Sequence, residues 1–162
     1  MRLHGLLVLF LTFVFIIPSS KSQVYLLNED FSSSNGITPP KGWTQVQFKG
    51  AATDYWHFDN PGTRKTTYPI VGKFGIFDSE KTSGGGGFES VALESPFVDC
   101  SFGTKILLYF DHQFVGGRNG KAILEVYNGK EWLVYKTFTG NTSGIVSEQF
   151  DIRDRKSTRL NS

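Results

Sequence analysis

Short runs of β-branched and aromatic residues recur along this chain, and they constrain its fold more than any other feature. After residue 23, no stretch repeats its apolar residues with the period of an amphipathic helix. Gly, Pro, Asn or Asp interrupts the runs roughly every ten residues, as in short strands joined by turns. The runs are VYLLNEDF, GWTQVQFKG, DYWHF, KFGIFDS, ESVALESPFV, TKILLYFDHQFV, KAILEVYNG, EWLVYKTF and IVSEQFDI. This pattern predicts an all-β sandwich or barrel.

Residues 121–138, KAILEVYNGKEWLVYKTF, contain the clearest pair of predicted strands. Asn128-Gly129 separates the two strands, and this dipeptide is a strong signal for a two-residue hairpin turn. Alternation along the first strand places Leu124 and Val126 on one face and Glu125 on the other. Strands with a single apolar face predict two antiparallel sheets packed over a shared core.

Glycine-rich stretches predict loops at two further places. SGGGG, residues 83–87, is too rich in glycine for a paired strand and is expected to form an exposed loop tip. A phosphate-binding loop is the alternative, but such a loop needs a following helix and a Lys-Ser/Thr pair, and FESVALESP offers neither. Asn119-Gly120 predicts a second tight turn.

The amino terminus has the pattern of a secretory signal peptide. Arg2 precedes an apolar run over residues 5–17, and small residues follow at Ser20 and Ser22. The apolar run is shorter than the about 20 residues that a membrane span requires. We therefore predict a signal peptide over residues 1–22 and a secreted chain without a membrane span after cleavage.

The carboxyl terminus resembles a translated laboratory sequence. Residues 154–162, DRKSTRLNS, match the in-frame translation of a widely used sequencing adapter, so they are expected to have no packing role. The natural domain is then predicted to occupy residues 23–153. The formal charge of +2 includes two net positive charges in residues 1–22 and two more in 154–162, so the domain itself carries about −2. Nucleic-acid binding, which needs a clustered positive face, is not supported.

Two single residues bear on processing. Cys100 is the only cysteine, so no disulfide forms within the chain, and we expect this thiol to be buried or to have its partner elsewhere. Asn141-Thr142-Ser143 is an N-glycosylation sequon, which has meaning if the protein is secreted by a eukaryote.

The order of the motifs resembles that of the cleaved-adhesin, or choice-of-anchor J, domains, which are similar in pattern to MAM domains. NEDFSSSNGITPPKGWTQV looks like the first strand, proline loop and Gly-Trp of the family, and later signatures are KFGIFDSE, VALESPFVDCS and KILLYFDHQFVGG. The likeness covers residues 25–153. It implies a secreted, non-catalytic jelly-roll antiparallel β-sandwich, often one module of a larger adhesin or peptidase. It also implies closing strands after SEQFDI that are missing here.

The same resemblance implies a structural calcium ion. Calcium prefers six to eight oxygen ligands, many of them carboxylates in loops. The positions that match the family are Glu29, Asp78 and Asp111, although Ser32 stands where a second acidic residue is expected. The alternative is that all three carboxylates are solvated or accept hydrogen bonds in turns.

The adjacent Asp111 and His112 do not predict catalysis. Neighbouring side chains on a strand point to opposite faces, so these two cannot form an acid–base dyad if the strand is regular. If Leu108 and Phe110 face the core, then His112 faces it too. Metal-protease and serine-hydrolase motifs are absent from the sequence. A site with two histidines, His57 and His112, and a carboxylate stays open, as does a pair of carboxylates for glycoside hydrolysis.

Aromatic and polar residues cluster beside a turn in DYWHFDNPG, residues 54–62. Tyr55, Trp56 and Phe58 are therefore the candidate ligand-binding rings, although aromatic residues in a β-sandwich more often form the core. We expect a secreted binding or adhesion module that recognises extracellular protein or glycan surfaces. The alternatives are an accessory domain of a secreted hydrolase such as a peptidase, and a glycan-specific module.

Overall fold

A computed structural model describes residues 24–82, 88–100, 105–116, 120–152 and 160–161. The predicted signal peptide, the glycine-rich tip at 83–87 and Asn119 of the second predicted turn lie outside the described residues. Within the described part, no helix is long and apolar enough to cross a membrane.

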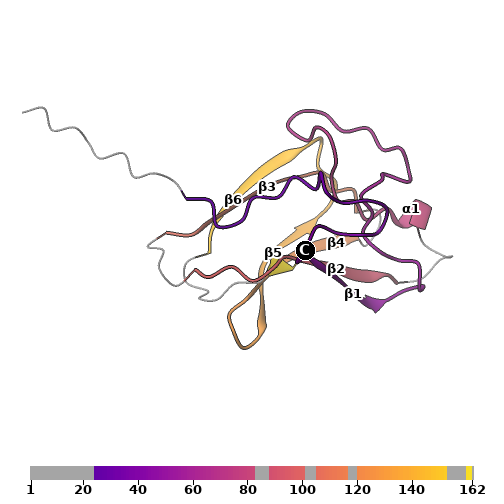
Figure 1. Ribbon diagram of the computed structural model, residues 1–162. Coiled ribbons are helices and arrows are strands. Elements are labelled where there is room, and N and C mark those ends of the chain that lie inside the picture. Colours follow the sequence, from indigo (N-terminus) through magenta and orange to yellow (C-terminus); the bar gives the residue numbers. More distant parts are fainter. Residues whose placement is uncertain (1–23, 83–87, 101–104, 117–119, 153–159, 162) are drawn as a thin grey trace, which may run out of the picture.

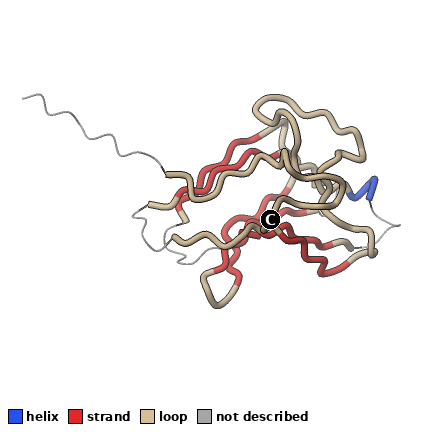
Figure 2. Tube along the Cα trace, viewed as in Figure 1, coloured by secondary structure: helices blue, strands red, loops and turns tan. Residues whose placement is uncertain are grey.

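The described chain forms two antiparallel sheets, and the predicted all-β class is confirmed. The elements are β1 (Thr44–Lys49), α1 (Ser79–Thr82), β2 (Ser90–Glu94), β3 (Leu107–His112), β4 (Lys121–Tyr127), β5 (Trp132–Thr139), β6 (Val146–Asp151) and β7 (Leu160–Asn161). One sheet has the strand order β1-β2-β7-β4-β5, and the other consists of β3 and β6. Figures 1 and 2 show the two sheets as separate layers.

Aromatic side chains between the layers hold the small sheet against β5. β3 and β6 pair from Leu107 with Asp151 to His112 with Val146. Phe110 and Phe150 point toward β5, where the ring centroid of Phe110 lies 6.3 Å from that of Phe138. His112 lies on the same face, with its ring 4.6 Å from Phe138. The predicted alternation along β3 is therefore confirmed.

The predicted hairpin is confirmed, but its turn is longer than expected. Tyr127 pairs with Trp132, so four residues rather than two connect β4 and β5. The side-chain oxygen of Asn128 accepts hydrogen bonds from the amides of Lys130 and Glu131 at 2.9 and 3.0 Å. This Asx-type bonding gives the chain an alternative to the two-residue turn.

A bulge in β5 brings two of its rings onto the same face. Leu124 pairs with Lys136 and Glu125 pairs with Val134, so Tyr135 is the extra residue on β5. The bulge shifts the alternation by one position. Tyr135 and Phe138 therefore both contact the β3–β6 sheet, and the hydroxyl of Tyr135 donates to the carbonyl of Asp151 at 2.8 Å.

The most buried apolar residues come from several elements and form the core. Val126 has no exposed surface, and Leu124 of the same strand is also buried, as the alternation predicted. The other buried apolar side chains are Phe58, Ala92, Leu93 and Ile152.

Three predicted strands are wrong. Residues 24–31 form no strand; there the carboxylates of Glu29 and Asp30 instead accept hydrogen bonds from amides two residues later. Local bonding of this kind competes with strand pairing. Residues 54–58 and 73–79 form only one isolated bridge, between His57 and Ile76.

β7 is an exception to the expectation that residues 154–162 have no packing role. Asn161 pairs with Glu94 of β2 and Glu125 of β4, and Leu160 pairs with Val126. Figure 1 shows the carboxyl terminus beside these strands. β2 and β4 run parallel to each other on either side of β7. Their facing edges present backbone groups that pair readily with an extended segment.

Candidate functional site: an anchored loop and a cleft

Residues 58–75 form a long loop, here called the anchored loop, whose two ends are tied together. His57 and Ile76 exchange backbone hydrogen bonds of 2.7 and 2.8 Å across its base. Figure 1 shows this loop rising above the sheets between β1 and α1. Its sequence contains Pro61, Gly62, Pro69 and Gly72, which explains why it does not continue as a strand.

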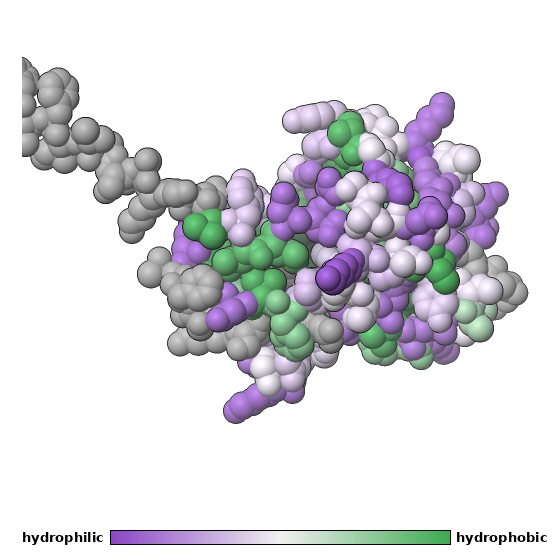
Figure 3. Space-filling model, viewed as in Figure 1, coloured by the Kyte–Doolittle hydropathy of each residue, from purple (hydrophilic) through white to green (hydrophobic). Residues whose placement is uncertain are grey.

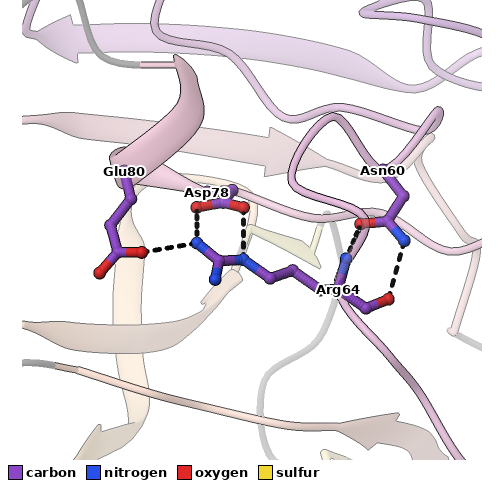
Figure 4. Close-up of polar contacts among 4 residues, drawn as sticks. All are labelled: Asn60, Arg64, Asp78 and Glu80. Atoms are coloured by element: carbon purple, nitrogen blue, oxygen red, sulfur yellow. Dashed lines mark hydrogen bonds and ion pairs between the residues drawn. The ribbon is translucent and has the colours of Figure 1, made fainter.

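Arg64 links the anchored loop to the start of α1. Its Nε and Nη2 atoms donate to the two carboxylate oxygens of Asp78 at 2.7 and 2.8 Å, and Nη2 also donates to Glu80 at 2.7 Å (Figure 4). The Asp78 side chain is only 5% exposed. The planar guanidinium fits a carboxylate in this two-bond arrangement, which fixes both distance and orientation.

The charges in this cluster shift the pKa values of both partners. Hydrogen bonds from Arg64 hold the pKa of Asp78 below its ordinary value, because they stabilise the charged form more than burial destabilises it. Hydrogen bonds to Asp78, and then to Glu80, raise the pKa of Arg64 above its ordinary value. The pair is therefore ionised near neutral pH.

Local contacts position Arg64 for this pairing. The side chain of Asn60 accepts from the Arg64 amide and donates to its carbonyl, both at 2.8 Å (Figure 4). Gly62 lies against the ion pair, because a Cβ atom there would stand 2.1 Å from Asp78 Oδ2 and 2.9 Å from Arg64 Nε. Only glycine leaves the space that the bidentate pair occupies.

The tip of the anchored loop presents apolar side chains to solvent. Tyr68 is 85% exposed and Val71 is 71% exposed. Just beyond the tip, the Nζ atom of Lys73 donates to the carbonyl of Ser34, which adds a third attachment of the loop to the body. Figure 3 shows a green, apolar area at the top of the viewed face, where Figure 1 draws this loop.

A cleft of about 350 Å³ opens between β5 and the β3–β6 sheet. His112 and Phe138 meet in its wall, and the Nζ atom of Lys136 lies 6.0 Å from the centre of the Phe138 ring. The full lining is His112, Phe114, Lys136, Thr137, Phe138, Thr139, Gly140, Asn141, Thr142, Val146 and Glu148. The cleft thus combines aromatic side chains with several polar groups.

The Asp111-His112 pair is not a catalytic dyad in this arrangement. Asp111 accepts a 2.5 Å hydrogen bond from Ser147 on the outer face of β3. His112 points to the opposite face, where its Nε2 atom lies 3.7 Å from a carboxylate oxygen of Glu148. That separation is too long for a hydrogen bond, and within the described structure the Nε2 atom has no hydrogen-bond partner.

The predicted calcium ligands occupy three separate surroundings. Glu29 accepts from the amide of Phe31, Asp78 from Arg64, and Asp111 from Ser147. In the parts of the chain that the structure describes, no three His, Cys, Asp or Glu residues form a metal-binding group. Arg64 engages both carboxylate oxygens of Asp78, and a calcium ion at Glu29, Asp78 and Asp111 stays a prediction.

The three predicted ligand-binding rings differ in their surroundings. Phe58 is 3% exposed and stacks on Phe31 with 5.4 Å between ring centroids, so it lies in the core. Trp56 is half-buried and packs against Phe77, and its amide donates to the Gln45 side chain. Tyr55 is also half-buried. None of the three lies at the exposed tip of the anchored loop.

Sequence reasoning missed Arg64, Tyr68 and Val71. The stretch from Asn60 to Lys73 contains no local pattern that pairs Arg64 with an acid 14 residues away. The geometry defines an all-β chain with an anchored loop above its sheets and a cleft between them. No family model, curated protein or solved structure matches the chain.

Proposed function

We propose that this chain is a secreted, non-catalytic module that binds an extracellular protein through the tip of the anchored loop. The observation that carries the proposal is the exposure of Tyr68 and Val71 at the tip of a loop held by three attachments. Binding residues are concentrated on loops that a rigid scaffold positions. Exposed tyrosines are among the residues that contribute most to protein interfaces.

The attachments favour binding because they reduce the cost of ordering the loop. The bridge at His57, the ion pair of Arg64 and the contact of Lys73 each restrict the backbone before a partner arrives. A preorganised loop loses less conformational freedom on association, so more of the contact energy appears as affinity.

The resemblance to the cleaved-adhesin domains supports the same function and the finer architecture. We infer that the two antiparallel sheets are parts of a jelly-roll sandwich, since their strands follow the order of the family's motifs. The runs that carry the likeness include β2, β3 and the segment ending at Asp78. Domains of this family serve in adhesion and recognition.

The test is a binding screen of the secreted chain against an array of extracellular proteins, with a glycan array alongside. We expect Tyr68→Ala and Val71→Asp to weaken binding to the protein partner at least tenfold. Tyr109→Ala is the matched control, because Tyr109 is an exposed ring on the outer face of β3. Equal binding by the loop variants, or binding to glycans alone, would overturn the proposal.

A further inference from the structure

Asn141, the asparagine of the sequon, lies on the rim of the cleft in the connection between β5 and β6. The side chain is exposed, and its Oδ1 atom accepts a hydrogen bond from the amide of Gly116 at 3.0 Å. Within the described structure, no hydrogen bond engages the Nδ2 atom. Ser143, the third residue of the sequon, is also exposed.

The chemistry of N-glycosylation is compatible with this contact. The reaction joins Nδ2 to C1 of an N-acetylglucosamine. The bond between C1 and the oxygen of a lipid-linked pyrophosphate breaks, and its electron pair stays on that oxygen as the lipid pyrophosphate leaves. Nδ2 gives up one of its two protons to the solvent. Oδ1 is unchanged and still accepts the hydrogen bond from Gly116. The hydrogen bond from Gly116 is therefore compatible with a glycan on Nδ2 of Asn141.

The cleft offers a surface for the first sugar beside this nitrogen. Phe138 precedes Asn141 by three residues, and both line the cleft. Gly140, with φ of +75° and open space around its Cβ position, turns the chain between them. A pyranose ring has an apolar face that packs on an aromatic ring, and the nearby Lys136 and Glu148 supply polar groups for its hydroxyls and N-acetyl group.

We propose that Asn141 carries an N-linked glycan whose first N-acetylglucosamine packs against Phe138 in the cleft. The donor is the lipid-pyrophosphate-linked oligosaccharide of a eukaryotic secretory pathway. The inference depends on the predicted secretion but not on the anchored loop, which lies at a different place in the fold. The glycan on Asn141 covers the cleft and stabilises the β5–β6 connection.

Occupancy is tested by expressing the full chain in eukaryotic cells that make only high-mannose glycans. Protein recovered from the medium is digested and analysed by mass spectrometry. We expect an oligosaccharide on Asn141 in the natural sequence and in Ser143→Thr, and none in Ser143→Ala. Secreted protein without a glycan at Asn141 would overturn the proposal. Absence of the protein from the medium would contradict the secretion on which it depends.

Placement of the sugar is tested by thermal unfolding. An endoglycosidase that leaves one N-acetylglucosamine on Asn141 should preserve a Tm about 2–4 °C above that of Ser143→Ala, the shift expected for one modest contact in a domain of this size. In a Phe138→Leu background, which keeps an apolar side chain but removes the ring, the difference should fall below about 1 °C. Packing in the cleft would be excluded if the Tm difference were the same in the Phe138→Leu background. It would also be excluded if the chain with Phe138 showed no Tm difference.

Discussion

Arg64 and Asp78, 14 residues apart, form a bidentate ion pair in which both carboxylate oxygens accept hydrogen bonds, at 2.7 and 2.8 Å. The two sides of the pair differ in environment, because the Arg64 side chain is 42% exposed while that of Asp78 is almost fully buried. Asp78 thus depends on Arg64 to stabilise its negative charge, which water would otherwise solvate. The pair connects the anchored loop to α1 and holds the base of the proposed binding tip.

Removal of the guanidinium should destabilise the fold. Arg64→Ala leaves the buried Asp78 carboxylate without its cation, and we expect the free energy of unfolding to fall. Arg64→Lys keeps the charge but loses the two-bond geometry, so its loss of stability should be smaller. The matched control is Glu80→Gln, whose carboxylate is 78% exposed and should contribute under about 0.5 kcal/mol. Urea unfolding measures the stability of all three variants. Equal losses in Arg64→Ala and Glu80→Gln would mean that the pair of Arg64 with Asp78 does not stabilise the fold.

Gly62 should not accept even a methyl group. In Gly62→Ala the new Cβ atom overlaps the Asp78 carboxylate, so the ion pair must separate or the loop must move, at a cost of about 2 kcal/mol. Gly144→Ala is the control, because its Cβ meets nothing within 4 Å, and its effect should stay within about 0.5 kcal/mol. Thermal unfolding of the two variants makes the comparison, and similar Tm values would show that the close approach is absent in solution.

Acid should weaken the fold through Asp78. Its pKa is lower in the folded state than in the unfolded chain, so the folded state binds the proton less readily. The resulting stabilisation is complete above the ordinary aspartate pKa of about 4 and is lost as the pH falls through the folded value. We expect the stability difference between the natural chain and Asp78→Asn to shrink from pH 6 toward pH 2. Parallel stability curves over that range would refute this assignment.

The two faces of the β4–β5 hairpin should differ in sensitivity to truncation. Leu124→Ala opens a cavity in the core and should lower the free energy of unfolding by about 3 kcal/mol. Val134→Ala removes an exposed side chain from the neighbouring strand and should cost under about 0.5 kcal/mol. Chemical denaturation distinguishes the two, and comparable losses would mean that the strand faces are assigned incorrectly.

Local sequence patterns predicted the elements whose partners are close or whose alternation is regular. The runs that became β1 to β6 were each identified as strands, and the alternation along β3 and β4 placed His112 and Leu124 toward the core. The same reasoning failed for residues 24–31, because side chains there bond to nearby amides in place of a neighbouring strand. It also gave the hairpin a turn that was too short, since it did not anticipate the bonding of Asn128.

The candidate site was less accessible to such reasoning. The clustering of aromatic and polar residues predicts ligand-binding rings at Tyr55, Trp56 and Phe58, yet Phe58 packs in the core. The exposed ring at Tyr68 lies between two runs that were predicted as strands, in a stretch for which the sequence made no prediction. Composition does not reveal which aromatic side chains a core has room to bury.

By itself, the sequence determined the all-β class, the approximate positions of six strands and the buried faces of β3 and β4, because alternation and turn propensity act over a few residues. Tertiary structure alone decided that Arg64 meets Asp78, that a bulge at Tyr135 aligns two rings, and that Phe138 and Asn141 share a cleft. These outcomes depend on distances between segments far apart in the chain, and on shifts of a single residue in register, which no local pattern encodes.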